Sequence, residues 1–319
     1  MMSQSHYFEP NANRPVVGRF APSPTGRMHA GNIYAALSAW LVAKSQGGTI
    51  VLRIEDLDRD RSKAEYISAV QRDFELLGLT WDHGPFFQHD RDEVYLEAFS
   101  ALERRGLVYP CFCTRADLHA ASAPHRGEKF VYPGTCRGLT AEQIAEKSMR
   151  RAPAQRLRVP DAAYSFEDMV QGRYEQNLAH DCGDFLIRRS DQAFAYQLAV
   201  VVDDAAQGVT SIVRGVDLLC STPQQLYLQE LLGLDHPRYA HIPLLVAEKN
   251  RRLSKRDHDA GIEELLARFK TPAAIIGHIA GICGLAPTCD PATPEQLLAT
   301  FDVARLPELF GDPVQIAWR

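Results

Sequence analysis

The sequence lacks a hydrophobic run long enough to cross a membrane. Its most apolar stretch, residues 273–289, is interrupted by His278 and Pro287 and contains three glycines, whereas a bilayer-spanning helix needs about 20 predominantly apolar residues. The first fifteen residues have neither the basic start nor the apolar centre of a secretory signal. We therefore expect a cytoplasmic protein that does not act at a membrane.

An excess of basic charge is also missing. The 35 Lys and Arg residues face 40 Asp and Glu residues, which gives a net charge of -5. A uniformly basic nucleic-acid-coating protein is thereby excluded, although a local basic face stays possible. The 45% hydrophobic and 24% charged residues are typical of a globular chain, and 319 residues fit one main body with an insertion or a tail.

Cysteine is scarce and odd in number. Seven cysteines without an export signal argue against a disulfide framework. Cys111, Cys113 and Cys136 instead offer three soft ligands for a tetrahedral, structural zinc ion, and imidazole from His119 or His125 would be the usual fourth ligand. The other four cysteines are interpreted as thiols placed for packing: Cys182, Cys220, Cys283 and Cys289.

Residues 16–54 have the pattern of a β-α-β unit. Residues 16–20 predict a strand, residues 21–26 a turn stiffened by proline and glycine, and the apolar spacing from Asn32 to Gly47 a helix. Residues 49–54 predict a second strand that ends in an acidic cluster. Such a unit opens a parallel sheet and places its loop where open α/β sheets bind ligands.

Later segments extend this α/β pattern. Helices are expected at residues 64–77, 91–105 and 222–232, the last capped by Ser221 or Thr222, and strands at 195–202, 212–213 and 242–246. Residues 107–189 differ in composition and are interpreted as an insertion. After Lys255 the pattern is helical, with segments at 262–269 and 273–283. The fold class predicted is a Rossmann-like parallel sheet with an insertion and a helical C-terminal stem.

The loop after the first strand fits neither of two common nucleotide motifs. Residues 26–31 match the first half of a Walker A loop, but Asn32 and Ile33 stand where lysine and serine or threonine are needed. The Gly-x-Gly-x-x-Gly of a dinucleotide site is absent from this turn. His29 and Asn32 would still stand at a helix N-terminus, which attracts phosphate. The alternative is that His29 only caps the helix.

A basic segment far along the chain complements this loop. Residues 250–256 carry four positive charges and a serine just before Lys255; alone, they would be interpreted as a solvated basic turn. Together, His29-Ala30-Gly31-Asn32 and Arg252-Leu253-Ser254-Lys255-Arg256 resemble the HIGH and KMSKS signatures of class I aminoacyl-tRNA synthetases. The resemblance implies that His29, Asn32 and Lys255 are catalytic, and that these residues with Gly31, Arg252 and Ser254 bind ATP and its Mg²⁺.

Two further stretches are similar to glutamyl-tRNA synthetases. These are Arg-Phe-Ala-Pro-Ser-Pro-Thr-Gly at residues 19–26, and Arg214-Gly215 followed by residues 221–225. The resemblance runs from about Arg19 to Arg256 and implies the following glutamate-binding residues: Arg19, Phe20, Ala21, Pro22, Ser23, Glu55, Tyr196 and Arg214. Two guanidiniums suit a substrate with two carboxylates, and Glu55 can pair with its ammonium group. Both arginines could instead be ordinary ion-pair partners.

Two departures from that family narrow the resemblance. Residues 258–319 leave no room for the large helical anticodon-binding domains, and Val200, four residues after Tyr196, stands where that family typically has asparagine in the substrate pocket. With the cysteine pattern, they resemble the truncated paralogues that attach glutamate to queuosine in tRNA(Asp). The resemblance implies that the protein activates L-glutamate with ATP. It also implies that Tyr132 is the fourth zinc ligand, with His125 as the alternative. The catalytic domain would span residues 1–257 and be interrupted by a zinc-bearing insertion at about 107–189. A monomer is expected.

Other functions stay open from the residues alone. A truncated or discriminating glutamyl-tRNA synthetase would charge the 3′ end of tRNA(Glu). A small-molecule nucleotidylyltransferase also uses a helix-terminal histidine loop, and a zinc-bearing RNA-binding module would have no turnover. The sequence leaves open whether activation needs tRNA. It also leaves open whether Arg150, Arg151, Arg156 and Arg158 form a phosphate-contacting stripe or a solvated face.

Overall fold

The computed structural model describes residues 4–10, 14–114, 117, 131–247, 251–252, 261–310 and 315–318, with only the backbone for 247, 251 and 252. Its α-helices are α1 (Ala30–Lys44), α2 (Ala64–Leu76), α3 (Asp92–Arg104), α5 (Ala141–Arg150), α6 (Leu178–Asp181), α7 (Tyr196–Ala206), α8 (Thr222–Leu232), α9 (Ile262–Phe269), α10 (Pro272–Ile282), α11 (Pro294–Leu298) and α12 (Leu306–Phe310). Short 3-10 helices are η1 (Gln88–Asp90), η2 (Val216–Ser221) and η4 (Val303–Arg305).

The strands form four sheets. Three of them have three strands: β2 (Val17–Phe20), β3 (Thr49–Ile54) and β4 (His83–Phe87); β5 (Val108–Cys111), β6 (Ala154–Leu157) and β9 (Phe185–Arg188); β13 (Arg251–Arg252), β12 (Leu244–Ala247) and β14 (Gln315–Ala317). The fourth has the order β1 (Gln4–Phe8), β7 (Ala162–Asp168), β11 (Arg238–Ile242) and β10 (Ser211–Gly215), and β8 (Gly172–Asn177) pairs with β7.

Two of these sheets adjoin and form the centre of the molecule. The backbone N–H of Thr210 donates to the carbonyl of Val17 at 2.9 Å, which brings β10 beside β2. The strand order across the centre is therefore β4-β3-β2-β10-β11, and the pairs β4-β3, β3-β2 and β10-β11 are parallel. Chain order reverses between β2 and β10, as in doubly wound folds. The predicted mostly parallel, Rossmann-like α/β fold is confirmed.

The sequence explains why the first β-α-β unit is central. Strand β3 is a continuous β-branched and apolar run with both faces buried, as expected for a parallel strand covered by helices. Helix α1 is apolar on nearly every side and packs between this sheet and the C-terminal helices. At Gly48 an added Cβ would stand 2.4 Å from the carbonyl oxygen of Val16, so the tight entry into β3 requires glycine.

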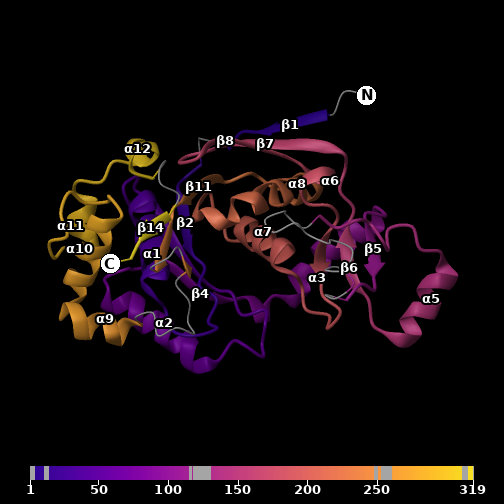
Figure 1. The fold of residues 1–319 in the computed structure, drawn as a ribbon, viewed down its shortest axis with the longest axis horizontal. Coiled ribbons are helices and arrows are strands. Elements are labelled where there is room, and N and C mark those ends of the chain that lie inside the picture. The colour runs from indigo at the N-terminus through magenta and orange to yellow at the C-terminus, as the bar shows by residue number, and fades with distance from the viewer. Residues whose placement is uncertain are drawn as a thin grey trace.

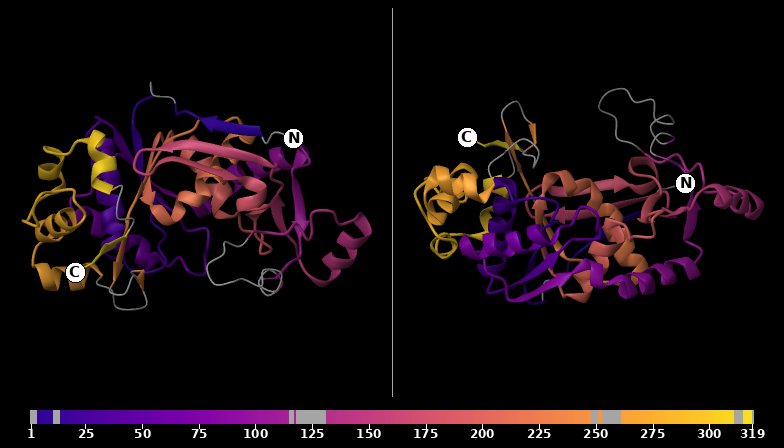
Figure 2. Two further views of the ribbon diagram at one scale, coloured as in Figure 1. Left: turned by 45° about the horizontal axis from the view of Figure 1, so that its top comes forward. Right: turned by 90° about the horizontal axis from the view of Figure 1, so that it is seen from below.

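The molecule is elongated, with distinct structures at its two ends. Helices α9, α10, α11 and α12 gather at one end beside α1, and the small β5-β6-β9 sheet with α5 lies at the other (Figures 1 and 2). Within the described ranges, no helix combines the length and apolarity needed to cross a bilayer. Strands β7 and β8 fall within the predicted insertion but pair in the five-stranded sheet. The division into domains stays a prediction.

One predicted strand is wrong. Residues 195–202 begin helix α7, whose side chains from Leu198 to Asp204 are all buried. A short apolar run that is buried on every side has no periodicity to distinguish a strand from a helix, and its β-branched valines favoured the strand. Strand β1 and helix α5 were not predicted, and the segment at 242–246 divides into β11 and β12 at Pro243. Helix 222–232 and strand 49–54 are confirmed to the residue.

A buried ion network ties strand β3 to helix α7. Arg53 of β3 is completely buried and donates to Asp204 at 2.8 Å, with Glu55 at 3.5 Å and Asp203 at 3.8 Å. Asp203 also accepts hydrogen bonds from Arg91 at 2.5 Å and from Gln88 and Tyr95, each at 2.8 Å. Burial lowers the pKa of Arg53, but the carboxylates outweigh it and raise the pKa, so the guanidinium stays charged.

Replacing this guanidinium should destabilise the fold strongly. We expect Arg53→Met to lower the free energy of unfolding by about 3 to 5 kcal/mol, because it leaves buried carboxylates without their shared cation. Urea unfolding followed by circular dichroism measures the effect. Arg305→Met, which removes an arginine paired with Glu308 at the surface, is the matched control and should change stability little. Equal losses for the two variants would contradict the role given to Arg53.

Candidate active site

A cavity of about 490 Å³ opens where strands β2 and β10 lie side by side. This is the point at which chain order reverses in the central sheet, and open α/β sheets bind ligands at such a point. The walls come from the ends of β2 and β10, the first turns of α1, and single residues of β3, α2, α7 and η2. They are Arg19, Phe20, Ala21, Pro22, Ser23, Met28, Asn32, Ala35, Ala36, Glu55, Phe74, Tyr196, Val213, Arg214, Gly215 and Leu218.

All eight residues predicted to bind glutamate line this cavity. Five of them follow one another from Arg19 to Ser23, and the other three are Glu55, Tyr196 and Arg214, from three distant parts of the chain. The turn after β2 is fixed to the end of β3, because the backbone N–H of Glu55 donates to the carbonyl of Pro22 at 3.0 Å. The structure brings these side chains together, and what they bind stays a prediction.

Arg19 and Glu55 are held from behind by the buried ion network. Asp204 lies 3.5 Å from Nε of Arg19, and Nη1 of Arg19 donates to the carbonyl of Val213 at 3.3 Å. Burial lowers the pKa of Arg19, although Asp204 opposes the shift. Burial also raises the pKa of Glu55, and Arg53 and Arg19 work against that rise. Both side chains thus have charged neighbours in defined positions.

Arg214 is held by neutral groups instead. Its Nε donates to Nε2 of His241 at 2.9 Å, its Nη2 to Oγ1 of Thr222 at 2.8 Å, and its Nη1 to the hydroxyl of Tyr196 at 3.4 Å. Nδ1 of His241 in turn lies 2.6 Å from the carboxylate of Asp168. Thr222 begins helix α8 with Pro223 beside it, and its hydroxyl serves Arg214 while Ser221 holds the cap position.

The predicted phosphate-binding turn begins helix α1. His29 is the residue before the helix, and its backbone N–H donates to Oδ1 of Asn32 at 3.1 Å. Asn32 lines the cavity, whereas His29 and Gly31 stand in the same turn without lining it. The N-terminus of α1, which is the positive end of the helix dipole, therefore adjoins the cavity at Asn32 and favours an anion there.

Of the predicted basic loop at residues 250–256, only the backbone of Arg251 and Arg252 is described. Ser254 and Lys255 lie outside the described residues, and Arg252 is described only as backbone in β13, paired with Val246 of β12. Before the loop in the chain, β12 packs against α1. After the loop, Glu263 of α9 forms an ion pair with Arg27, which lies just before the turn that begins α1. The chain on both sides of this loop is therefore held against α1 and the turn that begins it.

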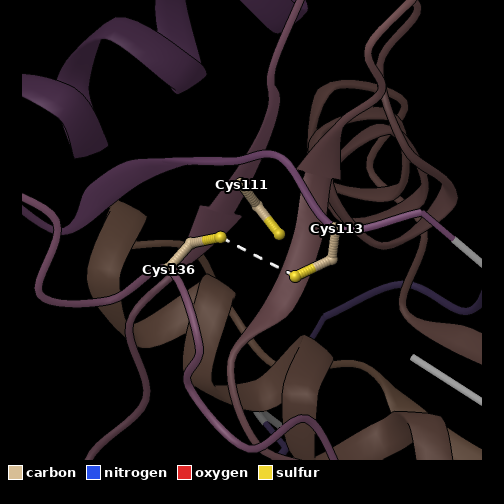
Figure 3. Close-up of side chains that lie close together, drawn as sticks. All are labelled: Cys111, Cys113 and Cys136. Atoms are coloured by element: carbon tan, nitrogen blue, oxygen red, sulfur yellow. Dashed lines mark hydrogen bonds between the residues drawn. The ribbon is translucent and has the colours of Figure 1, made fainter. Parts of the chain in front are cut away.

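Three cysteine sulfurs gather in the small sheet at the far end of the molecule. Cys111, Cys113 and Cys136 place their sulfurs within 4.8 Å of one another, and Cys113 and Cys136 are 3.7 Å apart (Figure 3). A tetrahedral ion with metal–sulfur bonds of about 2.3 Å would separate its sulfurs by about 3.8 Å. The cluster thus has a spacing that could hold a metal ion.

The hydroxyl of Tyr132, the predicted fourth ligand, lies beside these three sulfurs. It is 3.5 Å from the sulfur of Cys111 and 3.9 Å from that of Cys113. Gly183 packs so closely against the backbone of Tyr132 that a Cβ at Gly183 would stand 2.6 Å from the carbonyl oxygen of Tyr132. His119 and His125, the alternative ligands, lie outside the described residues.

Arg156 belongs to the cysteine cluster and not to a surface stripe. It is buried, donates to the sulfur of Cys111 at 3.2 Å and lies 3.7 Å above the Tyr132 ring. Burial acts to raise the pKa of Cys111, but hydrogen bonds from Tyr132 and Arg156 outweigh it and lower the pKa. The thiolate, which is the form that binds metal, is thereby favoured.

Sequence reasoning missed the groups behind the cavity. Asp203, Asp204, Asp168 and His241 were not singled out, although charged residues within apolar runs were a signal that could have found them. Val200 was expected in the substrate pocket. It lies one helical turn after Tyr196 on the same face of α7, but it is buried in the apolar core and does not line the cavity.

Comparisons with known proteins give consistent similarities. The family model described as tRNA synthetases class I (E and Q), catalytic domain, matches residues 15–283. A protein of Nitratidesulfovibrio vulgaris named glutamyl-Q tRNA(Asp) synthetase is 44% identical over 303 residues, 92% of this chain and 94% of its own. A protein of the same name from Symbiobacterium thermophilum is 42% identical over 315 residues, 94% of this chain and 96% of its own.

Solved structures agree with these sequence similarities. A glutamate tRNA ligase from Elizabethkingia meningosepticum, in complex with its amino acid, is similar over 95% of this chain and 67% of its own, with a TM-score of 0.78 and 25% identity. The glutamate-tRNA synthetase of Elizabethkingia anophelis has a TM-score of 0.80 at 25% identity and covers 95% of this chain and 68% of its own.

Proposed function

Because the chain belongs to the class I tRNA synthetases for glutamate and glutamine, within the glutamyl-Q tRNA(Asp) synthetase family, we propose that it joins L-glutamate to queuosine at the anticodon of tRNA(Asp), with ATP as the energy source. The observation that carries the proposal is the convergence of Arg19, Glu55 and Arg214 in one cavity. Two guanidiniums and one carboxylate complement the two carboxylates and the ammonium group of glutamate.

The first step is activation of glutamate. An oxygen of its α-carboxylate attacks the α-phosphorus of ATP, the bond to the bridging oxygen breaks, and pyrophosphate leaves with the electron pair. Mg²⁺ carried with ATP supplies charge neutralisation on the phosphates. No protein nucleophile is needed, so the residues of the chain contribute by alignment, which is worth about 7 to 11 kcal/mol of barrier.

Two parts of the chain would hold ATP. His29, Gly31 and Asn32 stand at the positive end of the α1 dipole, where phosphate oxygens are favoured. Lys255, with Ser254 and Arg252, would neutralise the charge that develops on the departing pyrophosphate. The ion pair between Arg27 and Glu263 supports this role, because it holds the chain after the basic segment to the α1 turn.

The second step transfers the glutamyl group. A hydroxyl of the queuosine cyclopentenediol attacks the carbonyl carbon of the adenylate, the bond to the phosphate oxygen breaks, and AMP leaves with the electron pair while the hydroxyl proton passes to water. We propose that a cytoplasmic monomer of catalytic domain, zinc-bearing insertion and C-terminal stem carries out both steps. The alternative is a glutamyl-tRNA synthetase that charges the 3′ end of tRNA(Glu), since the two similar solved structures are named as glutamate–tRNA ligases or synthetases.

The acceptor distinguishes these two functions. With ATP, Mg²⁺ and radioactive glutamate, we expect transfer to tRNA(Asp) that carries queuosine and none to the same tRNA without it. Transfer to tRNA(Glu) should be absent, because its 3′ end is not the acceptor. Charging of tRNA(Glu) without labelling of modified tRNA(Asp) would overturn the proposal in favour of the alternative.

Two substitutions should separate the roles of the cavity and the basic segment. In ATP–pyrophosphate exchange with tRNA present, Lys255→Ala should lower kcat by about a hundredfold or more with little change in KM for glutamate, since its charge matters most when pyrophosphate leaves. Arg214→Ala should chiefly raise KM for glutamate. Each variant controls for the other, and the same pattern in both would contradict the assignment.

We propose a structural zinc ion held by Cys111, Cys113, Cys136 and Tyr132. The close spacing of these groups supports it, and three cysteine sulfurs, with Arg156 donating to that of Cys111, form the soft donor set that zinc prefers. Among the described residues, the apolar cluster around these ligands has four buried members, far fewer than the two large cores. A metal ion would therefore hold this segment together where apolar packing is limited.

Metal analysis tests this site independently of activity. The purified chain should contain one zinc ion per molecule, and Cys136→Ser should lose most of it and lower the thermal unfolding temperature. Cys289→Ser replaces an exposed cysteine outside the cluster and should keep both the metal and the stability. Full zinc content in the Cys136 variant would exclude that residue as a ligand.

A further inference from the structure

Three buried polar side chains form a row across neighbouring parallel strands. Asp168 ends β7, His241 lies in β11 and Arg214 in β10, with exposures of 2%, 0% and 5%. The strand register sets Arg214 directly opposite His241. Only the Arg214 end of this row reaches the cavity. The sheet itself therefore aligns a carboxylate, an imidazole and a guanidinium toward the place of the substrate.

The hydrogen bonds in this row define the protonation of His241. Because Nε of Arg214 can only donate, Nε2 of His241 accepts at 2.9 Å. The proton of the imidazole is then on Nδ1, which donates to Asp168 at 2.6 Å. Burial is the largest influence on the pKa of His241 and lowers it to about 4, although Asp168 opposes the shift. The imidazole is neutral near pH 7.

This arrangement leaves the charge of Arg214 available. Its three acceptors, on His241, Thr222 and Tyr196, are all neutral, and no carboxylate of the described chain forms an ion pair with it. Arg19, by contrast, has Asp204 at 3.5 Å. Five N–H donors are fixed in a planar fork, so three internal hydrogen bonds set the direction of the remaining two.

We propose that Asp168 and His241 are positioning residues that hold Arg214 as the carboxylate receptor of the cavity, by keeping His241 in the tautomer that accepts from Arg214. This inference rests on the proposed function, because it assigns the substrate carboxylate to Arg214. Asp168 acts through His241 and does not touch the substrate. The orientation of the guanidinium is thus fixed before glutamate binds.

Asp168→Asn is an informative substitution because its amide can adopt only one orientation. Oδ1 of Asp168 accepts backbone N–H groups of Val170 at 3.0 Å, Gln171 at 2.9 Å and His241 at 3.1 Å. In the variant these three donors require the amide oxygen, so the NH₂ group faces Nδ1 of His241. Nδ1 must then accept, Nε2 carries the proton, and two donors face each other between His241 and Arg214.

The test combines NMR with kinetics. In ¹⁵N-histidine-labelled wild-type protein, Nδ1 of His241 should be protonated and Nε2 not, and Asp168→Asn should reverse this. In ATP–pyrophosphate exchange with tRNA(Asp) present, Asp168→Asn should raise KM for glutamate about tenfold to a hundredfold, with a smaller change in kcat and none in KM for ATP. His241→Gln, whose amide oxygen can accept from Arg214, should raise KM less than Asp168→Asn.

Asp161→Asn is the matched control. Asp161 is paired with His180 at the surface at 3.2 Å, so the same substitution in another Asp–His pair should leave the kinetics unchanged. An unchanged KM in a folded Asp168→Asn variant, or a proton on Nε2 of His241 in the wild type, would overturn the inference. If the wild-type protein shows no glutamate-dependent exchange, the proposed function is wrong. In that case the tautomer of His241 measured by NMR is the remaining test of this inference.

Discussion

The structure depends on a guanidinium placed where water cannot reach it. Arg53 stands in a strand that is otherwise apolar, and its charge is balanced by carboxylates from α7 and from the end of its own strand. A buried arginine cannot become neutral, so its partners have to be held in fixed positions around it. Of those partners, Glu55 lines the cavity, and Asp204 forms an ion pair with Arg19, which also lines it. The buried ion network and the surroundings of the cavity therefore share the same residues.

The two arginines of the cavity differ in their surroundings. Arg19 shares its charge with Asp204, whereas Arg214 is held by neutral acceptors and keeps its charge for a ligand. The two cationic groups of the cavity are thus unequal, which suits the proposed substrate with its chemically distinct carboxylates. Since the side chains are held by buried neighbours, little reorganisation is needed when substrate binds.

Local features of the fold were predictable from sequence, and long-range contacts were not. Strand 49–54 and helix 222–232 follow from apolar runs and their flanking glycine and proline signals. Helix α7 was misread because burial on all sides removes periodicity. The cavity residues were found by resemblance to a family. His241 and Asp168 were missed because their roles appear only when strand order brings β7, β11 and β10 together.

The last described strand of the chain lies beside the hairpin that leads into the basic segment. Strand β14 pairs with β12, and the backbone N–H of Trp318 donates to the carbonyl of Val246 at 2.7 Å. Strand β13, on the other edge of β12, is the described part of that segment. A purification tag fused after Trp318 would therefore emerge next to the hairpin. A tag at the amino end would extend from β1, at the outer edge of the five-stranded sheet, and leave the hairpin undisturbed.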